Sequence, residues 1–448
     1  MSALPLLAGA ELDAPLAWDC GRPISRRRYL ADVAALAARL PARGAVLSLT
    51  ADRYRFAVGL AAAMLRGHVS LLPPNHTDDM VGRLRRQFDD VYALIDADAE
   101  AVSLPWVRHA AEPGSEPAEG PVPLVADVTL TACVLTSGST GTPTPHEKRW
   151  GLLVPNARAE AARLAQFMGR ADLAGVALVA TVPAQHMYGF ESTVLLALLG
   201  GAAFDAGRPF YPADIAAALD RVPRPRMLVT TPFHLKTLIE SGVPVPAVDL
   251  VLCATAPLAP QLAARAEAVL QAPLVEIYGC TEAGQVASRR TTAGAEWQTL
   301  GELRLQGDGD EVTVGGGHVP EPTRLADVLE VLDPSRFRLL GRANDLVNIA
   351  GKRSSLGHLN YHLNAIDGVL DGAFWMPPED ADSPAIVRLV AFVVAPALTS
   401  TQILAALRER IDPAFLPRRI VPVTSLPRDP TGKLPAARLA ALAAGPLG

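Results

Sequence analysis

The sequence is poor in cysteine and in aromatic residues. Four cysteines occur among 448 residues, and aromatic side chains make up 5% of the chain. Cys20, Cys133, Cys253 and Cys280 are widely separated, so they form no CxxC pair and no metal-ligand spacing. This pattern argues against a disulfide framework of the kind found in small secreted domains, and against a cysteine-based zinc site.

Long apolar runs and an excess of positive charge are also absent. The apolar stretches at 173–184 and 194–204 are shorter than the ~18–20 residues that a membrane-spanning helix needs. No basic residue precedes the apolar N-terminal segment, which argues against a signal peptide. The formal net charge is -5, so the composition does not indicate a nucleic-acid partner. We therefore expect a cytoplasmic protein without a membrane span.

Two common nucleotide-binding signatures are missing as well. The chain contains no GxxxxGK[ST] phosphate loop, and no GxGxxG segment follows a predicted strand. The first absence disfavours a small-molecule kinase or ATPase, and the second disfavours a dinucleotide-binding fold.

The chain does have enough apolar material for large cores. Half of its residues are hydrophobic and 19% are charged, and at ~100–200 residues per domain its length suggests at least two domains. From Ala45 onward, apolar runs alternate with segments of helical periodicity; the first unit is a strand at 45–50, a helix at 52–66 and a strand at 68–73. Because these runs are apolar without alternation, they predict parallel sheets covered by helices.

A composition change after Arg290 and a new strand and helix pattern from Leu346 indicate a second unit. The predicted fold class is α/β, with a large N-terminal domain over residues 1–343 and a small α+β C-terminal domain over 344–448. Segment 111–125 is rich in Pro, Gly and Glu, so we predict an exposed loop there.

The first segment with chemical interest is Leu135–Pro143, which reads LTSGSTGTP and directly follows a predicted strand. Glycines let the backbone approach a phosphate closely, and clustered Ser and Thr residues supply hydroxyl and amide donors. Taken alone, such a segment is more often a flexible polar loop.

Two further polar segments follow later in the chain. Glu276–Glu282 reads EIYGCTE, in which a Tyr can stack on a purine, a Thr can bond a phosphate oxygen and a Glu can hold Mg²⁺. The other consists of Leu340–Asp345, Asn348–Arg353 and Leu426–Leu434. Each of these residues in isolation is ordinary loop chemistry, and a lone Lys433 is typical of a solvated surface.

The order and spacing of these segments resemble the adenylate-forming superfamily of acyl-CoA synthetases, peptide-synthetase adenylation domains and luciferases. The resemblance runs from about Val46 to Leu434. The motifs that carry it are TSGSTG at 136–141, QHMYG at 185–189, ATAPL at 254–258, YGCTE at 278–282, Asp327 fifteen residues before Arg342, and the segment that contains Lys433.

The resemblance implies a large domain that binds ATP and a carboxylic acid, and a mobile C-terminal domain that carries a catalytic lysine. The implied catalytic residues are Lys433, Thr281 and Glu282, and Glu282 is also the implied Mg²⁺ ligand. The implied ATP-binding residues are Thr136, Ser137, Gly138, Ser139, Thr140, Gly141, Ala254, Thr255, Ala256, Tyr278, Asp327 and Arg342. The implied acid pocket is bordered by Gln185, His186, Phe190 and Gly279, and Gly351 would line a thiol tunnel. By itself, Gly351 is equally typical of a plain turn.

The chain departs from the family pattern at a few positions. The family's phosphate loop usually ends in Pro-Lys, whereas Thr144 follows Pro143 here and the nearest cation is Lys148. The hinge position, often Asp in the family, is Asn344, and Asn348 stands where Lys is common. These differences leave open which cation replaces the missing phosphate-loop lysine.

The runs GRANDLVNIAGKRSSL and PTPHEKRW are most similar to the stand-alone AMP-ligases of bacterial aryl polyene and xanthomonadin-type pigment pathways. This implies that an aromatic acid such as a hydroxybenzoate is activated with ATP and Mg²⁺ and passed to a phosphopantetheine thiol. An acyl carrier protein is the favoured acceptor. The alternatives are an acyl- or aryl-CoA ligase that uses free coenzyme A, and a non-catalytic nucleotide-binding protein. Retention of Lys433, Glu282 and Asp327 argues against the latter.

Replacing Lys433 by alanine is expected to slow acyl-adenylate formation by several orders of magnitude and to spare thioester formation from preformed acyl-adenylate. The resemblance places this one cation, on a mobile domain, at the reacting phosphate in the first step only. The measurement compares both half-reactions in the wild-type and Lys433→Ala proteins. An equal loss in the two half-reactions would rule out a lysine that serves one step.

Overall fold

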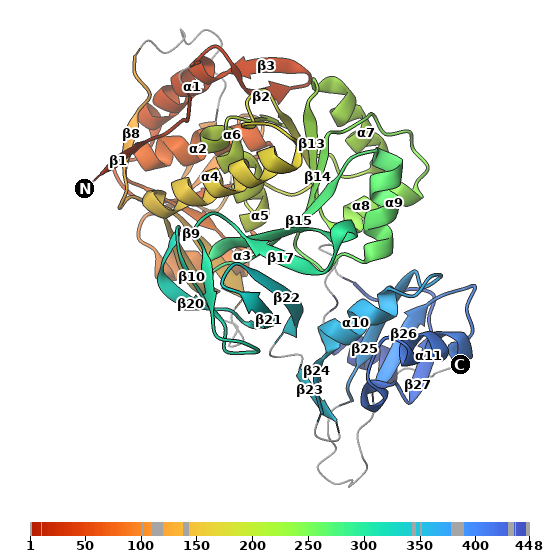
Figure 1. Ribbon diagram of the computed structural model, residues 1–448. Helices are drawn as coiled ribbons and strands as arrows, with labels where there is room; N and C mark the ends of the chain where they lie inside the picture. The colour runs from red at the N-terminus through yellow and green to blue at the C-terminus, as the bar shows by residue number, and fades with distance from the viewer. Residues whose placement is uncertain are drawn as a thin grey trace.

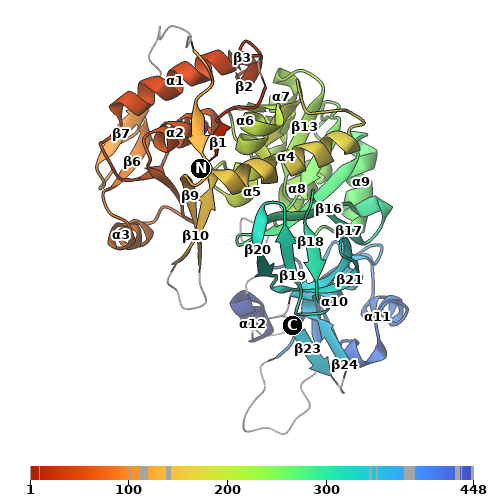
Figure 2. The same ribbon diagram turned by 60° about the vertical axis from the view of Figure 1, so that its left-hand side comes forward.

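The chain folds into a large body and a small unit below it, drawn in blue in Figure 1. The computed structural model describes residues 2–9, 11–100, 102–109, 120–137, 143–342, 346–349, 352–377, 389–428, 434 and 436–444. Figure 2 shows from a second direction that the small unit is built from the C-terminal elements.

Six described strands form the first sheet, in the spatial order β10-β9-β5-β4-β6-β7. Their bounds are β4 (Ala45–Ser48), β5 (Val69–Leu72), β6 (Val91–Asp96), β7 (Trp106–His109), β9 (Leu130–Ser137) and β10 (Pro143–Arg149). β4 pairs parallel with β5 and β6, and helix α2 (Arg53–Leu65) connects β4 to β5. Asp52 caps this helix by accepting a hydrogen bond from the Arg55 amide at 2.7 Å. The predicted strand–helix–strand unit is confirmed.

Eleven described strands form the second sheet, in the order β21-β22-β17-β16-β15-β14-β13-β11-β12-β2-β3. Their bounds are β2 (Pro15–Asp19), β3 (Arg22–Ser25), β11 (Ala177–Ala180), β12 (Ala203–Asp205), β13 (Arg226–Thr230), β14 (Leu250–Cys253), β15 (Leu274–Cys280), β16 (Gly284–Arg290), β17 (Glu296–Thr299), β21 (Asp327–Asp333) and β22 (Arg336–Arg342). Pairing is parallel from β2 to β15 and antiparallel from β15 to β21. The pairing therefore changes at the strand that carries the YGCTE segment.

Helices cover both faces of the parallel part of the second sheet. The described helices of the large body are α1 (Arg26–Arg39), α2, α3 (Asp78–Gln87), α4 (Trp150–Phe167), α5 (Met187–Gly189), the π-helix η1 (Phe190–Leu195), α6 (Leu196–Gly200), α7 (Pro212–Arg221), α8 (Pro232–Glu240), α9 (Pro260–Leu270) and the 3₁₀ turn η2 (Thr291–Ala293). Figure 1 shows α7, α8 and α9, in green, grouped on one side of the sheet. In β11, Ala177 and Val179 join the core under these helices, whereas Leu178 and Ala180 join the core that contains α4. Burial on both faces explains why such strands are apolar without alternation.

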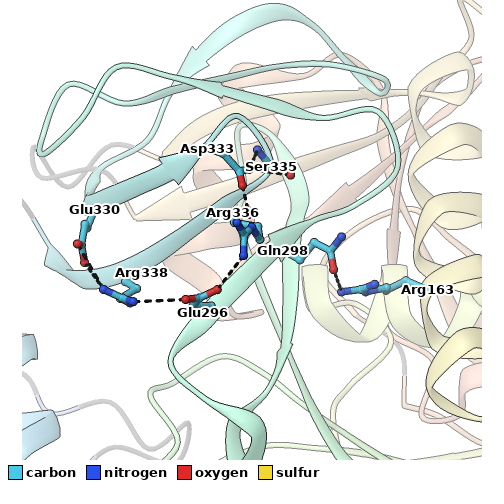
Figure 3. A network of polar contacts seen from close by, with 8 residues as sticks. All are labelled: Arg163, Glu296, Gln298, Glu330, Asp333, Ser335, Arg336 and Arg338. Atoms are coloured by element: carbon cyan, nitrogen blue, oxygen red, sulfur yellow. Dashed lines mark hydrogen bonds and ion pairs between the residues drawn. The ribbon is translucent and has the colours of Figure 1, made fainter.

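The antiparallel edge of the second sheet carries a ladder of charged side chains (Figure 3). Glu296 lies 3.4 Å from Arg336 and 3.3 Å from Arg338, and Arg338 also lies 3.2 Å from Glu330. These side chains are about half exposed, so each pair contributes less than about 1 kcal/mol. Another strand group, β18 (Arg304–Gln306), β19 (Thr313–Gly316) and β20 (Val319–Arg324), forms a small sheet of its own.

The small unit has separate sheets and a separate core. Its described elements are β23 (Leu346–Ile349), β24 (Lys352–Ser355), α10 (Leu356–Asn364), β25 (Asp371–Trp375), β26 (Val390–Val394), α11 (Ser400–Arg408), η4 (Pro413–Phe415), β27 (Arg419–Pro422) and α12 (Ala436–Ala444). Among the described residues no strand pairing joins this unit to the large body. The Ser355 hydroxyl, at the start of α10, donates a hydrogen bond to the Leu340 carbonyl of β22.

The predicted fold class is confirmed: a large α/β body with parallel sheets covered by helices precedes a small α+β unit. The change of sheet falls between Arg342 and Leu346, next to the predicted boundary at 343/344, which itself stays a prediction. No helix in the described ranges combines the length and hydrophobicity that crossing a bilayer requires.

The predicted exposed loop at 111–125 was wrong at its C-terminal end. Leu124–Ala126 form β8, which pairs antiparallel with β1 (Ala3–Pro5). Val125 is 4% exposed and packs into the main core, so a short apolar stretch outweighed the Pro- and Gly-rich composition before it. Residues 111–119 of the predicted loop lie outside the described residues.

Candidate active site

The predicted phosphate-loop segment begins at the end of β9, in the hairpin of β9 and β10. Thr136 and Ser137 end β9, and the loop that follows lies outside the described residues, including Gly138, Ser139, Thr140 and Gly141. Thr136 faces Thr144 across the hairpin, and its hydroxyl lies 3.1 Å from Nε2 of His146. Thr144, which replaces the family's lysine, is exposed. The two ends of the predicted phosphate loop are therefore held together by paired strands.

Lys148, the cation nearest to the loop in sequence, is on the inner side of β10. Its side chain is buried at 9% exposure, and its ammonium donates a hydrogen bond to the Thr281 carbonyl. Burial lowers the pKa of this ammonium, because the charged form is poorly solvated there. The lysine thus connects the hairpin of β9 and β10 to the YGCTE segment.

Thr281 and Glu282 lie in the turn between β15 and β16. Thr281 is half-buried and the Glu282 side chain is exposed. A Cβ atom at Gly279 would stand 2.3 Å from the Gly284 carbonyl oxygen, so a glycine is needed for the two strands to approach at this point. The predicted catalytic pair is therefore presented on a tightly closed hairpin.

Tyr278, Asp327 and Arg342 come from three strands of the second sheet, β15, β21 and β22. The Tyr278 hydroxyl donates a hydrogen bond to Oδ2 of Asp327 at 2.8 Å. The register of β21 and β22 places Asp327 directly opposite Arg342, of which only the backbone is described. The Tyr278 ring packs at 5.8 Å from Trp297 and 5.5 Å from Phe337. The fold therefore brings together residues that the sequence separates widely.

Ala254, Thr255 and Ala256 directly follow β14. Thr255 has a φ angle of +84°, a left-handed conformation that is unusual for a β-branched residue. Its hydroxyl oxygen is buried without a hydrogen-bond partner among the described residues. Strained backbone and an unpaired polar group are both costly, and they concentrate at ligand-binding sites.

The loop after β11 contains the predicted acid-pocket residues. The Gln185 amide donates to the Thr50 carbonyl at 3.3 Å, and the Tyr188 amide donates to Nδ1 of the exposed His186 at 3.3 Å. The Tyr188 hydroxyl donates to the Leu252 carbonyl at 2.9 Å, near the end of β14. These bonds fix the His186 loop beside the Ala254–Ala256 segment, at the carboxyl edge of the parallel strands, where α/β sheets bind their ligands.

Phe190 and Gly279 were also predicted to border the acid pocket. Phe190 is fully buried, with its ring 6.4 Å from that of Phe56, whereas Gly279 is exposed. Phe190 therefore lies in the core behind the His186 loop. Its role at the pocket border stays a prediction, as does that of Gly279.

A buried polar network lies behind these segments and was missed by sequence reasoning. Asn156 donates to Oε1 of Glu191 at 2.6 Å, and the Ser192 hydroxyl donates to Oε1 of Glu160 at 2.6 Å. Gln285 donates to the Ser192 hydroxyl at 2.8 Å. The sequence signal for this network was a glutamate within each of two segments that also carry many apolar residues. Because burying an unpaired charge is costly, such a glutamate indicates polar partners nearby.

Burial raises the pKa of Glu160 to about 8 and that of Glu191 to about 7. The cause in both cases is desolvation of the carboxylate; the charge of Lys148 and the hydrogen bond from Asn156 partly oppose it at Glu191. Glu160 is therefore mainly protonated at neutral pH.

Three further predicted residues lie outside the described part of the chain, in addition to those of the loop after β9. Gly351, the hinge residue Asn344 and the catalytic Lys433 all lie outside the described residues. Their predicted roles in the thiol tunnel, the hinge and adenylation stay predictions.

The described residues fit a nucleotide and Mg²⁺. The unpartnered Thr255 hydroxyl and the Tyr278–Asp327 pair offer polar groups to a nucleotide. No group of three or more His, Cys, Asp or Glu side chains within the described ranges could hold a metal ion. Mg²⁺ commonly uses one or two carboxylates together with substrate phosphates, so the exposed Glu282 suits an ion shared with ATP.

This arrangement is the fold of the adenylate-forming enzymes. ATP-bound MatB from Rhodopseudomonas palustris superposes with a TM-score of 0.77 at 18% identity, covering 97% of each chain. The amide bond synthetase McbA from Marinactinospora thermotolerans gives 0.77 at 19% identity, covering 96% of this chain and 97% of that chain. The o-succinylbenzoate CoA synthetase MenE from Bacillus subtilis, in complex with its acyl-adenylate, gives 0.75 at 16% identity over 98% of each chain.

The chain belongs to the AMP-binding enzyme family, whose pattern matches residues 25–328. A 4-coumarate–CoA ligase of Rhodobacter capsulatus is 32% identical over 284 residues, which cover 63% of this chain and 68% of that protein. A second 4-coumarate–CoA ligase, from Halorhodospira halophila, is 31% identical over 270 residues, 58% of this chain and 62% of that protein. The family match ends before Arg342, Gly351 and Lys433.

Replacing Glu160 by glutamine is expected to weaken the pH dependence of stability. Because the pKa of Glu160 is raised from its ordinary value of 4.5 to about 8 in the fold, its contribution to stability is full below pH 4.5 and is lost progressively as the pH rises to about 8. The free energy of unfolding, measured with denaturant, should fall by on the order of 2 kcal/mol between about pH 6 and about pH 9 in the wild type because of this group. It should fall by less in the variant. The exposed Glu302 provides a matched Glu302→Gln control. Identical losses in wild type and Glu160→Gln would contradict a buried, protonated Glu160.

Proposed function

We propose that this protein is an ATP-dependent carboxylic acid ligase that forms an acyl-adenylate and then transfers the acyl group to a thiol. The observation that carries the proposal is the 2.8 Å hydrogen bond between Tyr278 and Asp327, with Asp327 opposite Arg342. These three residues, all implied to bind ATP, come from three separate strands of the second sheet. Membership of the AMP-binding enzyme family supports the same activity.

The first step joins the acid to AMP. A carboxylate with a pKa of ~4 is ionised at neutral pH, so one of its oxygens can attack the α-phosphorus of ATP without a general base. A new P–O bond forms, the bond to the β-phosphate oxygen breaks, and pyrophosphate leaves with the bonding electrons. Since an anion must approach a polyanion, the protein's task is electrostatic.

The chain's own groups divide that task. The hairpin loop at 136–141 would hold the departing pyrophosphate, Thr281 would position the α-phosphate, and Lys433 would neutralise charge that develops between carboxylate and phosphate. A Mg²⁺ ion at Glu282 would supply further neutralisation of the phosphate oxygens.

In the second step, a thiol attacks the acyl carbonyl, a thioester forms and AMP leaves. The family resemblance implies that the small domain rotates between the steps, withdrawing Lys433 and bringing Gly351 to the thiol path. Domain rotation of this kind assembles one site for two reactions in turn.

The proposed acid is aromatic and hydroxylated, such as a hydroxybenzoate. The resemblance to pigment-pathway ligases supports this choice. The names of the two relatives support it too, because 4-coumarate is a hydroxylated aromatic acid. The loop that carries His186 would border the ring.

Acid-dependent ATP–pyrophosphate exchange tests the first step. With Mg²⁺ present, hydroxybenzoates and hydroxycinnamates should support exchange about tenfold or more better than long-chain fatty acids, because a shaped pocket discriminates between side chains. Nucleotide products are identified in the same reactions. Release of ADP in place of AMP would eliminate the ligase mechanism, and a preference for fatty acids would eliminate the aromatic assignment.

The proposed acceptor is a phosphopantetheine on an acyl carrier protein. Carrier proteins are generally acidic, and the small unit exposes arginines near α11 and β27 that could meet such a surface. These are Arg408, Arg410, Arg418 and Arg419. Lys352, by contrast, is paired with Asp412 at 2.6 Å. Free coenzyme A is the second candidate, and the names of the relatives favour it.

Transfer rates distinguish the two acceptors. Transfer to a phosphopantetheinylated carrier should be faster than transfer to coenzyme A at matched concentration, and should fall with added salt as screening weakens encounter. The quadruple change Arg408→Ala, Arg410→Ala, Arg418→Ala and Arg419→Ala should slow carrier transfer and leave adenylation intact. Saturable transfer to coenzyme A with none to any carrier would make this a CoA ligase.

A further inference from the structure

Strand β10 presents two different faces. His146 is half-buried and Lys148 is buried, whereas the alternate residues Glu147 and Arg149 are exposed. This alternation is that of a strand with one face toward the interior. The only cation on the inner face of β10 is therefore Lys148, four residues beyond the position where the family has its phosphate-loop lysine.

The Lys148 ammonium links two sheets. β10 is an edge strand of the first sheet, whereas the Thr281 carbonyl, which accepts the ammonium's hydrogen bond, lies in a turn of the second sheet. The bond spans 133 residues of sequence. It connects the hairpin that bears the predicted phosphate loop with the turn that bears Thr281 and Glu282.

Glu191 also lies close to this turn. A Cβ atom at Gly284 would stand 3.1 Å from Oε1 of Glu191, so this buried carboxyl group packs against the first residue of β16. Lys148 acts electrostatically on both Glu191 and Glu282. A buried cation and a buried acid therefore both lie against the segment from Thr281 to Gly284.

Burial of the charged Lys148 ammonium costs free energy, because the charge loses its hydration. Replacing a buried ion pair by apolar residues of similar volume is often neutral or stabilising, whereas removing one partner leaves a costly unpaired charge. A lysine buried at this cost is more readily explained by what it holds in place.

We propose that Lys148 is a positioning residue that clamps the hairpin of β9 and β10 to the turn of Thr281 and Glu282, and so takes over the fixed charge that Thr144 lacks. This inference rests on the proposed function, because it assigns the clamp to the binding of MgATP. The clamp sets the distance between the groups that would hold pyrophosphate and those that would hold the α-phosphate and Mg²⁺. A small displacement of either motif would weaken both binding and reaction.

The test compares four variants with the wild type. Lys148→Met keeps an unbranched side chain that is one atom shorter, and removes the charge and the hydrogen-bond donors. Glu191→Gln removes the opposing acid, and the double variant Lys148→Met/Glu191→Gln leaves neither charge unpaired. Arg149→Met is the matched control, since Arg149 is the next residue of β10, is exposed, and donates to the Val128 carbonyl at 2.9 Å, away from the turn.

Thermal unfolding, pyrophosphate exchange and calorimetric MgATP binding are measured for each protein. Lys148→Met should raise the KM for MgATP and lower the exchange rate, each by about 10- to 100-fold, as loss of a residue that orients a ligand group does. The double variant should regain thermal stability without regaining MgATP affinity, and Arg149→Met should behave as wild type. That separation of stability from affinity distinguishes positioning from packing.

Three results would overturn the clamp: exchange by Lys148→Met within about twofold of wild type, recovery of both stability and affinity in the double variant, or failure of both Met variants to fold. If the wild type shows no exchange with any acid, the proposed function fails. The clamp is then judged by MgATP binding alone, and an unchanged dissociation constant in the folded Met variants would overturn it.

Discussion

Strand β15 pairs parallel with β14 on one edge and antiparallel with β16 on the other, and the candidate site depends on this double pairing. The parallel side places the end of β15 beside the Ala254–Ala256 segment, at the edge where parallel strands point their carboxyl ends. The antiparallel side returns the chain at once, so that Thr281 and Glu282 occupy an exposed turn. The return requires Gly279, because a Cβ atom there would stand 2.3 Å from the Gly284 carbonyl oxygen.

The antiparallel strands that follow β15 contribute further residues to the candidate site. The pairing of β21 with β22 brings Asp327 opposite Arg342, and Asp327 lies 2.8 Å from the Tyr278 hydroxyl. Charged contacts of Glu296 with Arg336 and Arg338 lie along the same strands (Figure 3). Those surface pairs contribute little stability individually. Desolvation of the buried side chains of Glu160, Glu191 and Lys148 has a larger, unfavourable effect on the free energy of folding. Hydrogen bonds from Ser192 and Asn156 offset part of that cost.

Much of the fold could be predicted from local pattern. The helix over Arg53–Leu65 begins at its Asp52 cap, and the helix over Ser400–Arg408 begins with a capping box of Thr399 and Gln402, as their sequences suggest. Apolar strands without alternation predicted sheets covered on both faces. The loop at 111–125 was partly mispredicted, since Val125 gains more from joining the core than composition alone reveals. The pairing of β1 with β8 could not be predicted, because it joins segments more than a hundred residues apart.

The sequence by itself determined which chemical groups are available: the Ser- and Thr-rich loop, the YGCTE segment, Asp327 and its spacing to Arg342. It did so because the family's motifs keep their order along the chain, and order is a one-dimensional property. Only the tertiary structure decided which groups meet. It joined Tyr278 to Asp327, buried Phe190 behind the His186 loop, gathered the Glu160 and Glu191 network, and carried Lys148 to the Thr281 carbonyl. The physical reason is that burial and hydrogen bonding depend on distance in space, and two sheets that pack together bring into contact residues whose separation along the chain carries no signal.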